Sequence, residues 1–381
     1  MLDIKKIRQN PQEIADALKR RDLTFDTSKL LTCDEQRRQM LAQVEEKKAA
    51  RNTAGKKMGA ARKSPNSEKA VACIMAEMQQ LAEDIEALDT QIAGIDKRIE
   101  QQLLVLPNLP HATVPETDTI LSQNGSPKQF AWEPKSCFEL ANDHKMLLPG
   151  LNSTDTVFCG KGAALRRALI TYLLDELAKA NCLETDISNV DVSESAYVLP
   201  SLCRDKIYFA DELPVCNAVY LPCSHNKQGA KTSVVELFEI VAPQNSLEDA
   251  AKMAEVLQKL FELLELPCRA VLLCAEKLDF DAAKTFSIEV WMPALKNYVE
   301  AARCFTCEDF VARRTGIRFR TTVKEKPLQA HTLSGYIDLN KIFNALLENG
   351  QNDDASVSLP SALSKYTGFE SIEKNFSHVS P

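Results

Sequence analysis

The first hundred residues follow a helical pattern of apolar and polar positions. From Val71 to Ile99, apolar residues recur at alternating intervals of three and four without a break. This spacing places one apolar stripe along a helix and is typical of a coiled coil. A second helix-rich segment covers 34–63, and Ser-Pro-Asn-Ser at 64–67 indicates a turn between the two helices. The pattern therefore predicts a long antiparallel hairpin over about 34–104.

The pattern changes after the proline-bracketed sequence at 106–110. Short alternating or β-branched runs cover 233–242, 269–274 and 287–291, and amphipathic helical patterns cover 163–181 and 247–264. Strands and helices in this mixed order, without regular βαβ spacing, favour an α+β domain built on an antiparallel sheet. We therefore predict two domains, a helical arm over 1–110 and an α+β domain over 111–381.

Composition is typical of a soluble globular protein. Of the 381 residues, 45% are hydrophobic and 26% are charged. No run of eighteen apolar residues occurs, so we predict no transmembrane helix. The N-terminal segment lacks the apolar core of a signal peptide, and we expect a cytoplasmic protein. The twelve cysteines are then expected to be reduced thiols. Cys304 and Cys307 have metal-like spacing, but no second pair matches them, and we predict no metal site.

Charge is segregated between the two predicted helices. The net charge of −7 argues against a protein that coats nucleic acid indiscriminately. Segment 34–63 has nine basic and four acidic residues, whereas 64–104 has three basic and eight acidic residues. On charge alone, two interpretations stay open: the helices attract each other, or the basic helix binds phosphates. The basic residues are Arg37, Arg38, Lys47, Lys48, Arg51, Lys56, Lys57, Arg62 and Lys63.

Several segments match one protein family. They are 1–11, 106–110, 162–169, 272–274, 281–286, 288–293, 304–307, 309–314, 331–335, 347–349 and 351. With the basic-then-acidic hairpin, they resemble bacterial-type seryl-tRNA synthetases over nearly the whole chain. The resemblance implies a class II core, an antiparallel sheet flanked by helices, which makes seryl-adenylate from ATP and transfers serine to tRNA. It also implies that the coiled-coil arm contacts serine tRNA through the nine basic residues of 34–63, which we call the basic ladder. A further implication is that the protein is a homodimer.

The residues that handle ATP in that family are replaced here. The second-motif sequence Phe-Arg-Ser-Glu falls on Ser224, His225, Asn226 and Lys227. A neutral imidazole cannot make the bidentate contact that a guanidinium makes with phosphate. The third-motif arginine falls on Lys341, which keeps the charge but not the planar fork.

The metal and serine sites depart from the family pattern as well. The family's Glu-Ile-Ser-Ser is Glu300-Ala-Ala-Arg303, so a fixed cation replaces a hydroxyl at the metal and would repel magnesium. Ala242 stands in place of a glutamate, and Ser334 and Tyr336 replace asparagine and serine. The ammonium group of serine would lose polar partners in such a pocket.

These departures predict a seryl-tRNA synthetase paralogue that is a pseudoenzyme and binds tRNA through its arm, with no cofactor. We assign no catalytic residue and treat the replaced positions as a degraded pocket. Two alternatives remain. One is an active serine ligase, or a ligase for another small acyl substrate, that uses ATP and magnesium with Lys227, Arg303 and Lys341 supplying positive charge. The other is a protein-interaction or regulatory partner of a true synthetase.

Overall fold

The computed structural model describes residues 1–62, 68–148, 157–187, 198–225 and 231–373. The chain divides into two compact units, Met1–Pro107 and Asn108–Pro381, and each is described by itself. Among the described helices, none is both long and apolar enough to cross a membrane.

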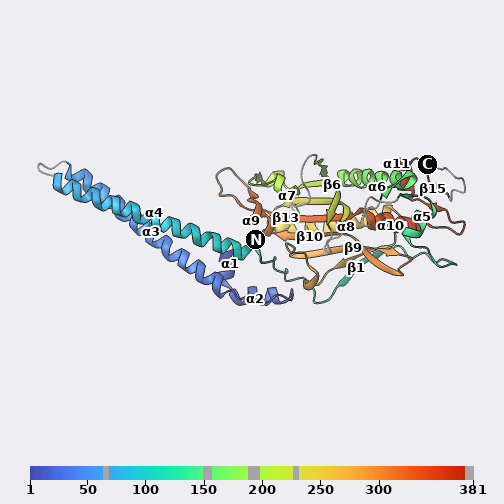
Figure 1. Ribbon diagram of the computed structural model, residues 1–381, viewed down its shortest axis with the longest axis horizontal. Coiled ribbons are helices and arrows are strands. Elements are labelled where there is room, and N and C mark those ends of the chain that lie inside the picture. Colours follow the sequence, from blue (N-terminus) through green and yellow to red (C-terminus); the bar gives the residue numbers. More distant parts are fainter. Residues whose placement is uncertain (63–67, 149–156, 188–197, 226–230, 374–381) are drawn as a thin grey trace. The chain divides into compact units, whose positions relative to one another are not determined.

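The first unit is helical. Its elements are α1 Ile4–Gln9, α2 Pro11–Lys19, α3 Ser28–Ala61 and α4 Glu68–Leu104. The two long helices α3 and α4 lie side by side as a hairpin (Figure 1). At 1.5 Å per residue, each is about 50 Å long. Val44 of α3 packs against Ile85 and Ile92 of α4, and both isoleucines belong to the predicted apolar stripe. The predicted helical hairpin is confirmed, although α3 begins six residues earlier than the pattern indicates, where Leu30 is fully buried.

The second unit is built on an eight-stranded sheet with the order β1-β8-β9-β10-β13-β7-β6-β4. The strands are β1 Thr119–Asn124, β4 Cys182–Glu184, β6 Val215–His225, β7 Lys231–Val241, β8 Cys268–Leu272, β9 Lys284–Met292, β10 Asn297–Glu308 and β13 His331–Asp338. Every neighbouring pair in this sheet is antiparallel except β4 with β6. The predicted α+β class with an antiparallel sheet is therefore confirmed.

Three helices cover one face of the sheet and form the core with it: α6 Gly160–Lys179, α8 Ser246–Leu263 and α10 Leu339–Gly350 (Figure 1). Side chains alternate between the faces of a strand, so Leu237, Cys304 and Phe286 point into this core with Leu257 of α8 and Phe343 of α10. The neighbouring positions on the same strands point to the opposite face, where the pocket lies.

Shorter elements complete the second unit. The helices are α5 Cys137–Asp143, α7 Val198–Leu202, α9 Phe310–Thr315 and α11 Ser361–Thr367, with single 3-10 turns η1 Ala210–Glu212, η2 Pro243–Asn245 and η3 Ala275–Lys277. A three-stranded sheet contains β5 Ile207–Phe209, β11 Arg318–Arg320 and β12 Leu328–Gln329. Two small ladders pair β2 Leu147–Leu148 with β3 Val157–Phe158 and β14 Val357–Ser358 with β15 Ser371–Ile372.

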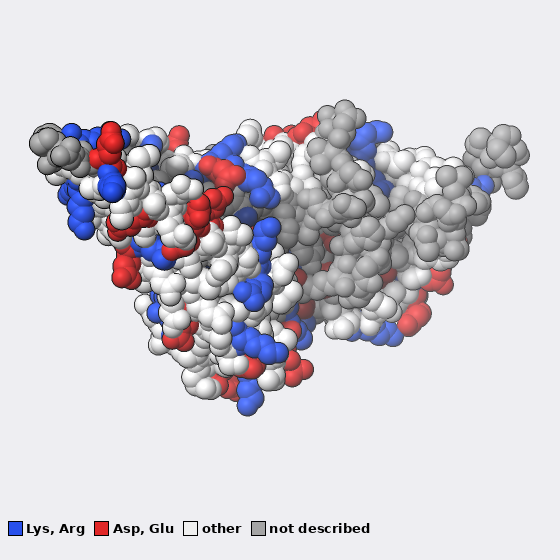
Figure 2. Space-filling model, turned by 60° about the vertical axis from the view of Figure 1, so that its left-hand side comes forward, with Lys and Arg blue, Asp and Glu red and all other residues white. Residues whose placement is uncertain are grey.

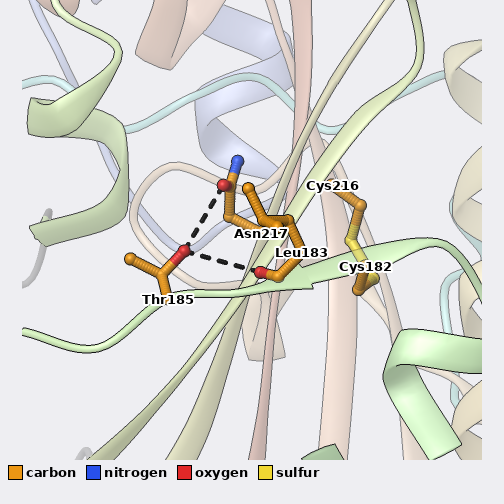
Figure 3. Close-up of a disulfide and its surroundings, with 5 residues drawn as sticks. All are labelled: Cys182, Leu183, Thr185, Cys216 and Asn217. Carbon is orange, nitrogen blue, oxygen red and sulfur yellow. Dashed lines mark hydrogen bonds between the residues drawn. A yellow bond between two sulfur atoms is a disulfide. The ribbon is translucent and has the colours of Figure 1, made fainter.

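A disulfide joins β4 to β6 at the edge of the large sheet. Cys182 and Cys216 are register partners in this parallel pair, their Cα atoms lie 4.5 Å apart, and their sulfurs are bonded (Figure 3). The expectation that all cysteines are reduced thiols is therefore wrong for these two. Strand register between residues 34 positions apart brings the thiols together, and no local pattern in the sequence reports that register.

Candidate active site and nucleic-acid interface

A pocket of about 760 Å³ opens on the face of the sheet that points away from α8. Its walls come from β9, β10, η3 and the loop that follows η3. The lining residues are Asp118, Leu273, Glu276, Lys277, Leu278, Asp279, Phe280, Ser287, Glu289, Glu300 and Arg303. Two of the positions singled out in the sequence, Glu300 and Arg303, therefore line one cavity.

A row of polar side chains runs across four neighbouring strands on the face of the sheet where the pocket lies. Ser287 of β9, Arg303 of β10, Tyr336 of β13 and Glu236 of β7 are successive register partners. Partners that lie directly opposite each other on antiparallel strands point to the same face. The sheet thus brings Arg303 together with Tyr336, both of which the sequence flags, and adds Ser287 and Glu236, which sequence reasoning missed.

Glu300 is surrounded by donors. Its Oε1 accepts from Arg303 Nε at 2.8 Å and from Arg303 Nη2 at 2.5 Å. Its Oε2 accepts from Ser287 Oγ at 2.6 Å and from Arg303 Nη2 at 2.7 Å. Tyr336 donates its hydroxyl to Oε1 at 3.3 Å. A carboxylate offers about four acceptor sites, so these donors occupy the whole acceptor capacity of Glu300.

Arg303 is the centre of this cluster. Its Nη1 donates to Asp279 Oδ2 at 2.7 Å, and its Cζ lies 5.5 Å from the centroid of the Tyr336 ring. Only 8% of the side chain is exposed. Burial by itself lowers the pKa of the guanidinium, but the charges of Glu300 and Asp279 outweigh burial and raise that pKa. Arg303 is a permanent cation held between two carboxylates.

This arrangement does not fit a magnesium ion at Glu300. A divalent cation needs free carboxylate oxygens and an environment without a fixed positive charge. Here both oxygens of Glu300 already accept hydrogen bonds, and a buried guanidinium occupies the adjacent space. We derive no catalytic step through a metal at this position.

Glu236 differs from the other carboxylates on this face. It is half-buried, and no hydrogen bond or ion pair joins its side chain to another described residue. Burial, and then the negative charge of Asp281, raise its pKa to about 7. Burial, followed by the charge of Glu300, also raises the pKa of the neighbouring Tyr336 hydroxyl. Glu236 is therefore a carboxyl group that titrates near neutral pH on the pocket face.

The remaining predicted pocket positions are scattered. Ser334 lies two positions from Tyr336 on β13, and its Oγ is 3.9 Å from Cys307 Sγ. Ala242 is a buried residue directly after β7. Lys341 is half-buried in the first turn of α10, where its backbone N–H donates to the Asp338 side chain. His225 ends β6 opposite Lys231 in the backbone register. Its side chain, and the whole of Lys227, lie outside the described parts of the chain.

Cys304 and Cys307 point to different surroundings. Cys304 Sγ donates to the Ala250 carbonyl of α8, 3.7 Å away, whereas Cys307 lies beside Ser334 on the opposite face. Both thiols are buried, and burial raises the pKa of each. Across the described residues, no three His, Cys, Asp or Glu side chains group as metal ligands would.

The arm uses part of its basic ladder to hold its two helices together. Arg37 pairs with Asp96, and Lys47 Nζ lies 2.7 Å from Asp84 Oδ2, both across the hairpin. Figure 2 shows basic and acidic side chains mixed over the visible face. Two further cations of the ladder pair within α3, Arg38 with Asp34 and Lys48 with Glu45.

The rest of the ladder is differently placed. No ion pair joins Arg51, Lys56, Lys57 or Arg62 to any other residue that the structure describes. Lys63 lies outside the described residues. The paired half of the ladder therefore agrees with attraction between the two helices, and the half without ion pairs agrees with binding of phosphates.

Asp279 and Ser287 of the pocket, and Glu236 on the same face of the sheet, are among the residues that sequence reasoning missed. A weak signal existed for Glu236, because it interrupts the apolar run Val234-Val235-Glu236-Leu237-Phe238 of a buried strand. Asp279 sits in a loop, and nothing in its local sequence indicates that it faces Arg303, 24 residues away.

Comparison with known proteins defines the class first. Residues 231–349 match the tRNA synthetase class II core domain (G, H, P, S and T), and residues 1–110 match the seryl-tRNA synthetase N-terminal domain. The fold agrees with both, so the chain is a class II aminoacyl-tRNA synthetase-like protein with a helical arm. A structure of seryl-tRNA synthetase from Pyrococcus horikoshii, complexed with ATP, superposes with a TM-score of 0.87 at 24% identity, covering 98% of this chain and all of that one.

The family follows from sequence relatives. The "Serine--tRNA ligase" of Carboxydothermus hydrogenoformans is 33% identical over 98% of this chain and 100% of its own length. The protein of the same name from Finegoldia magna is 32% identical with the same coverage. A cytoplasmic serine-tRNA ligase structure from Naegleria fowleri, in complex with AMP, shares the fold with a TM-score of 0.82 at 18% identity over 98% of this chain and 99% of that one. The chain belongs to the seryl-tRNA synthetase family.

Proposed function

We propose that this family member is a pseudoenzyme that binds serine tRNA through its arm and does not make an adenylate by a magnesium-assisted route. One observation carries the proposal: Arg303 engages both oxygens of Glu300, the carboxylate that the family resemblance assigns to the metal. In this proposal the arm at 1–110 carries the RNA contacts, and 111–381 carries the altered pocket.

The electrostatics of the pocket support this function. Adenylate formation requires cations that meet the negative charge growing on the phosphate in the transition state. The buried charge of Arg303 is already neutralised by Glu300 and Asp279. Breaking such a buried pair to serve a phosphate would leave an uncompensated carboxylate, which costs several kcal/mol, about 3–5. The main cation of the pocket is therefore paired with protein carboxylates and is not available to a phosphate.

The arm supports RNA binding. Arg51, Lys56, Lys57 and Arg62 follow the paired half of α3 and make no ion pair with other described residues. Lysine and arginine side chains that are not paired with a carboxylate can bind RNA phosphates and release the counterions of those phosphates. We further propose a homodimer located in the cytoplasm, as the family resemblance and the composition predict.

The second candidate function is an active ligase, and the comparisons favour it. Relatives named as serine--tRNA ligases match this chain over almost its entire length at 33% and 32% identity. In this case the protein would use ATP and magnesium to activate serine, or another small acyl substrate, through a rebuilt pocket. Lys227, Arg303 and Lys341 would supply the positive charge.

ATP–pyrophosphate exchange distinguishes the two candidates. Purified full-length protein is assayed with each standard amino acid separately, and a competent seryl-tRNA synthetase serves as the positive control. We expect no exchange, together with measurable binding of serine tRNA. Exchange with serine, or with any other amino acid, would establish the ligase and overturn the pseudoenzyme. Folded protein that binds no tRNA would overturn the RNA-binding role.

A variant tests the observation on which the proposal rests. Arg303→Ser removes the guanidinium and leaves Glu300 with donors from Ser287 and Tyr336 only. We expect magnesium binding by calorimetry in this variant and not in the wild type. Arg269→Ser is the matched control, because Arg269 is also paired with a pocket carboxylate, Glu289, through a 2.6 Å contact. Equal magnesium binding by wild type and Arg303→Ser would contradict the assignment.

A further inference from the structure

A lysine outside the arm and the pocket has surroundings that suit a chemical reaction. Lys284 is the first residue of β9 and is half-buried. Successive side chains of a strand alternate between its faces, so Lys284 lies on the same face as Phe286, which points into the core. Ser287, which lines the pocket, points the other way. Lys284 therefore lies outside the pocket cluster.

Among the described residues, no carboxylate neutralises Lys284. Its Nζ forms no ion pair with them, and it donates a hydrogen bond to Thr113 Oγ1 at 3.1 Å. The centroid of the Phe286 ring lies 5.5 Å from Nζ, at the far end of the range for a cation–π contact. The protein therefore stabilises the ammonium form of Lys284 weakly, because a neutral hydroxyl replaces the water that burial removes.

Burial changes the protonation of this amine. Removal from water disfavours a charged group, and burial lowers the pKa of Lys284. By contrast, a hydrogen bond to Asp118 raises the pKa of Lys277, and one to Glu248 raises the pKa of Lys252. Lys284 therefore has a larger fraction of neutral amine than these paired lysines, and the neutral amine is the nucleophilic form.

A hydroxyl and an imidazole continue the contact made by Lys284. The backbone N–H of Thr113 donates to His111 Nδ1 at 3.2 Å, so Nδ1 is an acceptor and the ring proton is on Nε2. Thr113 Oγ1 lies 2.9 Å from the same Nδ1 and donates its proton to it. The same Oγ1 accepts from Lys284. The three groups form a chain along which a proton can move from the amine to the imidazole.

The loop that carries these two groups is fixed to the sheet of the second unit. The backbone N–H of His111 donates to the carbonyl of Ala283, at 2.8 Å. The side chain of Asn108 donates to the carbonyl of Asp281, at 2.9 Å. Thr113 itself is exposed. The proton-accepting groups are therefore held in place by backbone contacts, at a position that a small reagent can reach from solvent.

We propose that Lys284 is an acylation site that accepts the acyl group of an activated donor, a thioester or an acyl phosphate, while Thr113 and His111 remove the proton. The neutral Nζ attacks the carbonyl carbon and forms a C–N bond. The C–S or C–O bond to the leaving group breaks, and the leaving group takes the electron pair. The Nζ proton passes to Thr113 Oγ1, whose own proton passes to His111 Nδ1 and then to solvent. The products are Nε-acylated Lys284 and a free thiolate or phosphate.

This site is independent of the proposed function, because it uses neither the arm nor the pocket. Its test is acylation of the folded, full-length chain. Acetyl-CoA is the thioester probe and acetyl phosphate is the acyl phosphate probe, each added alone near neutral pH. Peptide mass spectrometry measures the rate of acetylation at each lysine.

Two exposed lysines are the internal controls. Lys277 is paired with Asp118, and Lys324 makes no ion pair with a described residue. We expect Lys284 to react roughly tenfold faster than either, although it is less exposed. Reaction with one probe alone supports the site and identifies the class of donor. Reaction of Lys284 with neither probe, or no faster than the controls, would overturn the proposal.

Matched variants test the role of the hydroxyl and the imidazole. Thr113→Val removes the hydroxyl and keeps the side-chain shape, whereas Thr113→Ser keeps the hydroxyl. His111→Asn supplies an oxygen that can accept the Thr113 N–H but cannot take up the proton. Thr113→Val and His111→Asn are expected to slow acetylation of Lys284 by roughly tenfold or more. Thr113→Ser should retain the wild-type rate, and the control lysines should keep theirs in all three variants.

Thermal unfolding of the same variants separates proton removal from a structural role. If Thr113→Val and His111→Asn unfolded at a lower temperature but acetylated Lys284 at the wild-type rate, these residues would merely fasten the loop, and the proposal would be overturned. A lower rate in Thr113→Val that Thr113→Ser restores, with unchanged control lysines, supports it.

Discussion

The pocket cluster and strand β11 of the three-stranded sheet both contain arginines, but the surroundings of these arginines differ. In the pocket, Arg303 bonds to Glu300 and Asp279. In β11, the side chain of Arg318 has no hydrogen-bond or ion-pair partner among the described residues. A buried, paired cation contributes to position and stability, because removing it leaves charge without compensation. A partly exposed cation without a partner contributes little to folding and is available to an anionic ligand.

This difference bears directly on function. The pocket contains Glu300 and Arg303, two positions that the sequence analysis singles out, and its principal cation is already paired with the protein's own carboxylates. Among the described cations without an ion pair are Arg51, Lys56 and Lys57 in the second half of α3 and Arg318 in β11. This distribution of paired and unpaired charge is the physical basis of the proposed RNA-binding function.

The largest expected effect separates the two kinds of arginine. Arg303→Met leaves Glu300 and Asp279 without their cation and is expected to lower the free energy of unfolding by about 3–5 kcal/mol. Arg318→Met removes a cation with no partner among the described residues and is expected to change the free energy of unfolding by less than about 0.5 kcal/mol. Urea unfolding of both variants at neutral pH checks the prediction. Similar losses in the two variants would remove the distinction between the regions.

A smaller effect concerns Glu236, a pocket-face carboxyl that makes no ion pair with any described residue. Its folded-state pKa of about 7 exceeds the ordinary value of about 4.3. Between these pH values the folded state retains a proton that the unfolded state loses, so stability falls as the pH rises through this window. Glu236→Gln should therefore raise the free energy of unfolding by about 2 kcal/mol at pH 8 and leave it nearly unchanged at pH 4.

Glu239 provides the matched comparison for that experiment. Burial, and then the charge of Asp249, also raise its pKa to about 7, but it points to the α8 side of the sheet. Glu239→Gln should show the same pH dependence, and thermal unfolding between pH 4 and pH 8 measures both variants. A pH profile of Glu236→Gln parallel to that of the wild type would show that Glu236 is ionised normally.

The smallest effect extends the comparison to the arm. Replacing the unpaired cations in Arg51→Gln/Lys56→Gln/Lys57→Gln should weaken tRNA binding roughly tenfold and lower the salt slope by about 2.7. Replacing the paired ones in Arg37→Gln/Lys47→Gln/Lys48→Gln should weaken binding less and cost under about 1 kcal/mol of stability per pair. Filter binding over a range of salt concentrations measures both. A larger loss for the paired set would reverse our assignment of the ladder.

Local patterns account for the parts of the fold that were predicted. The apolar stripe containing Ile85 and Ile92 predicts the hairpin, because helical spacing is a property of neighbouring residues. The runs at 233–242 and 287–291 likewise correspond to β7 and β9. The start of α3 at Ser28 was not predicted, since burial of Leu30 by tertiary contacts extends the helix beyond the patterned region.

The candidate site was predicted less completely than the fold. Sequence and resemblance together singled out Glu300 and Arg303, and the structure brings them into direct contact. They could not identify Asp279, Ser287 or Glu236, because each enters the site from a different strand or loop. The bond between Cys182 and Cys216 was missed for the same reason.

The sequence by itself thus determined the helical arm and the α+β class, and with the family resemblance it predicted which pocket positions differ from the family's ATP-handling groups. These are matters of spacing and identity along the chain. Only the tertiary structure decided which charges neutralise each other and which stay open to a ligand. Coulombic and hydrogen-bonding interactions depend on distances of a few ångströms between residues remote in sequence, and strand register sets those distances. The opposite states of Arg303 and Arg318, fifteen positions apart on the same chain, follow from that register.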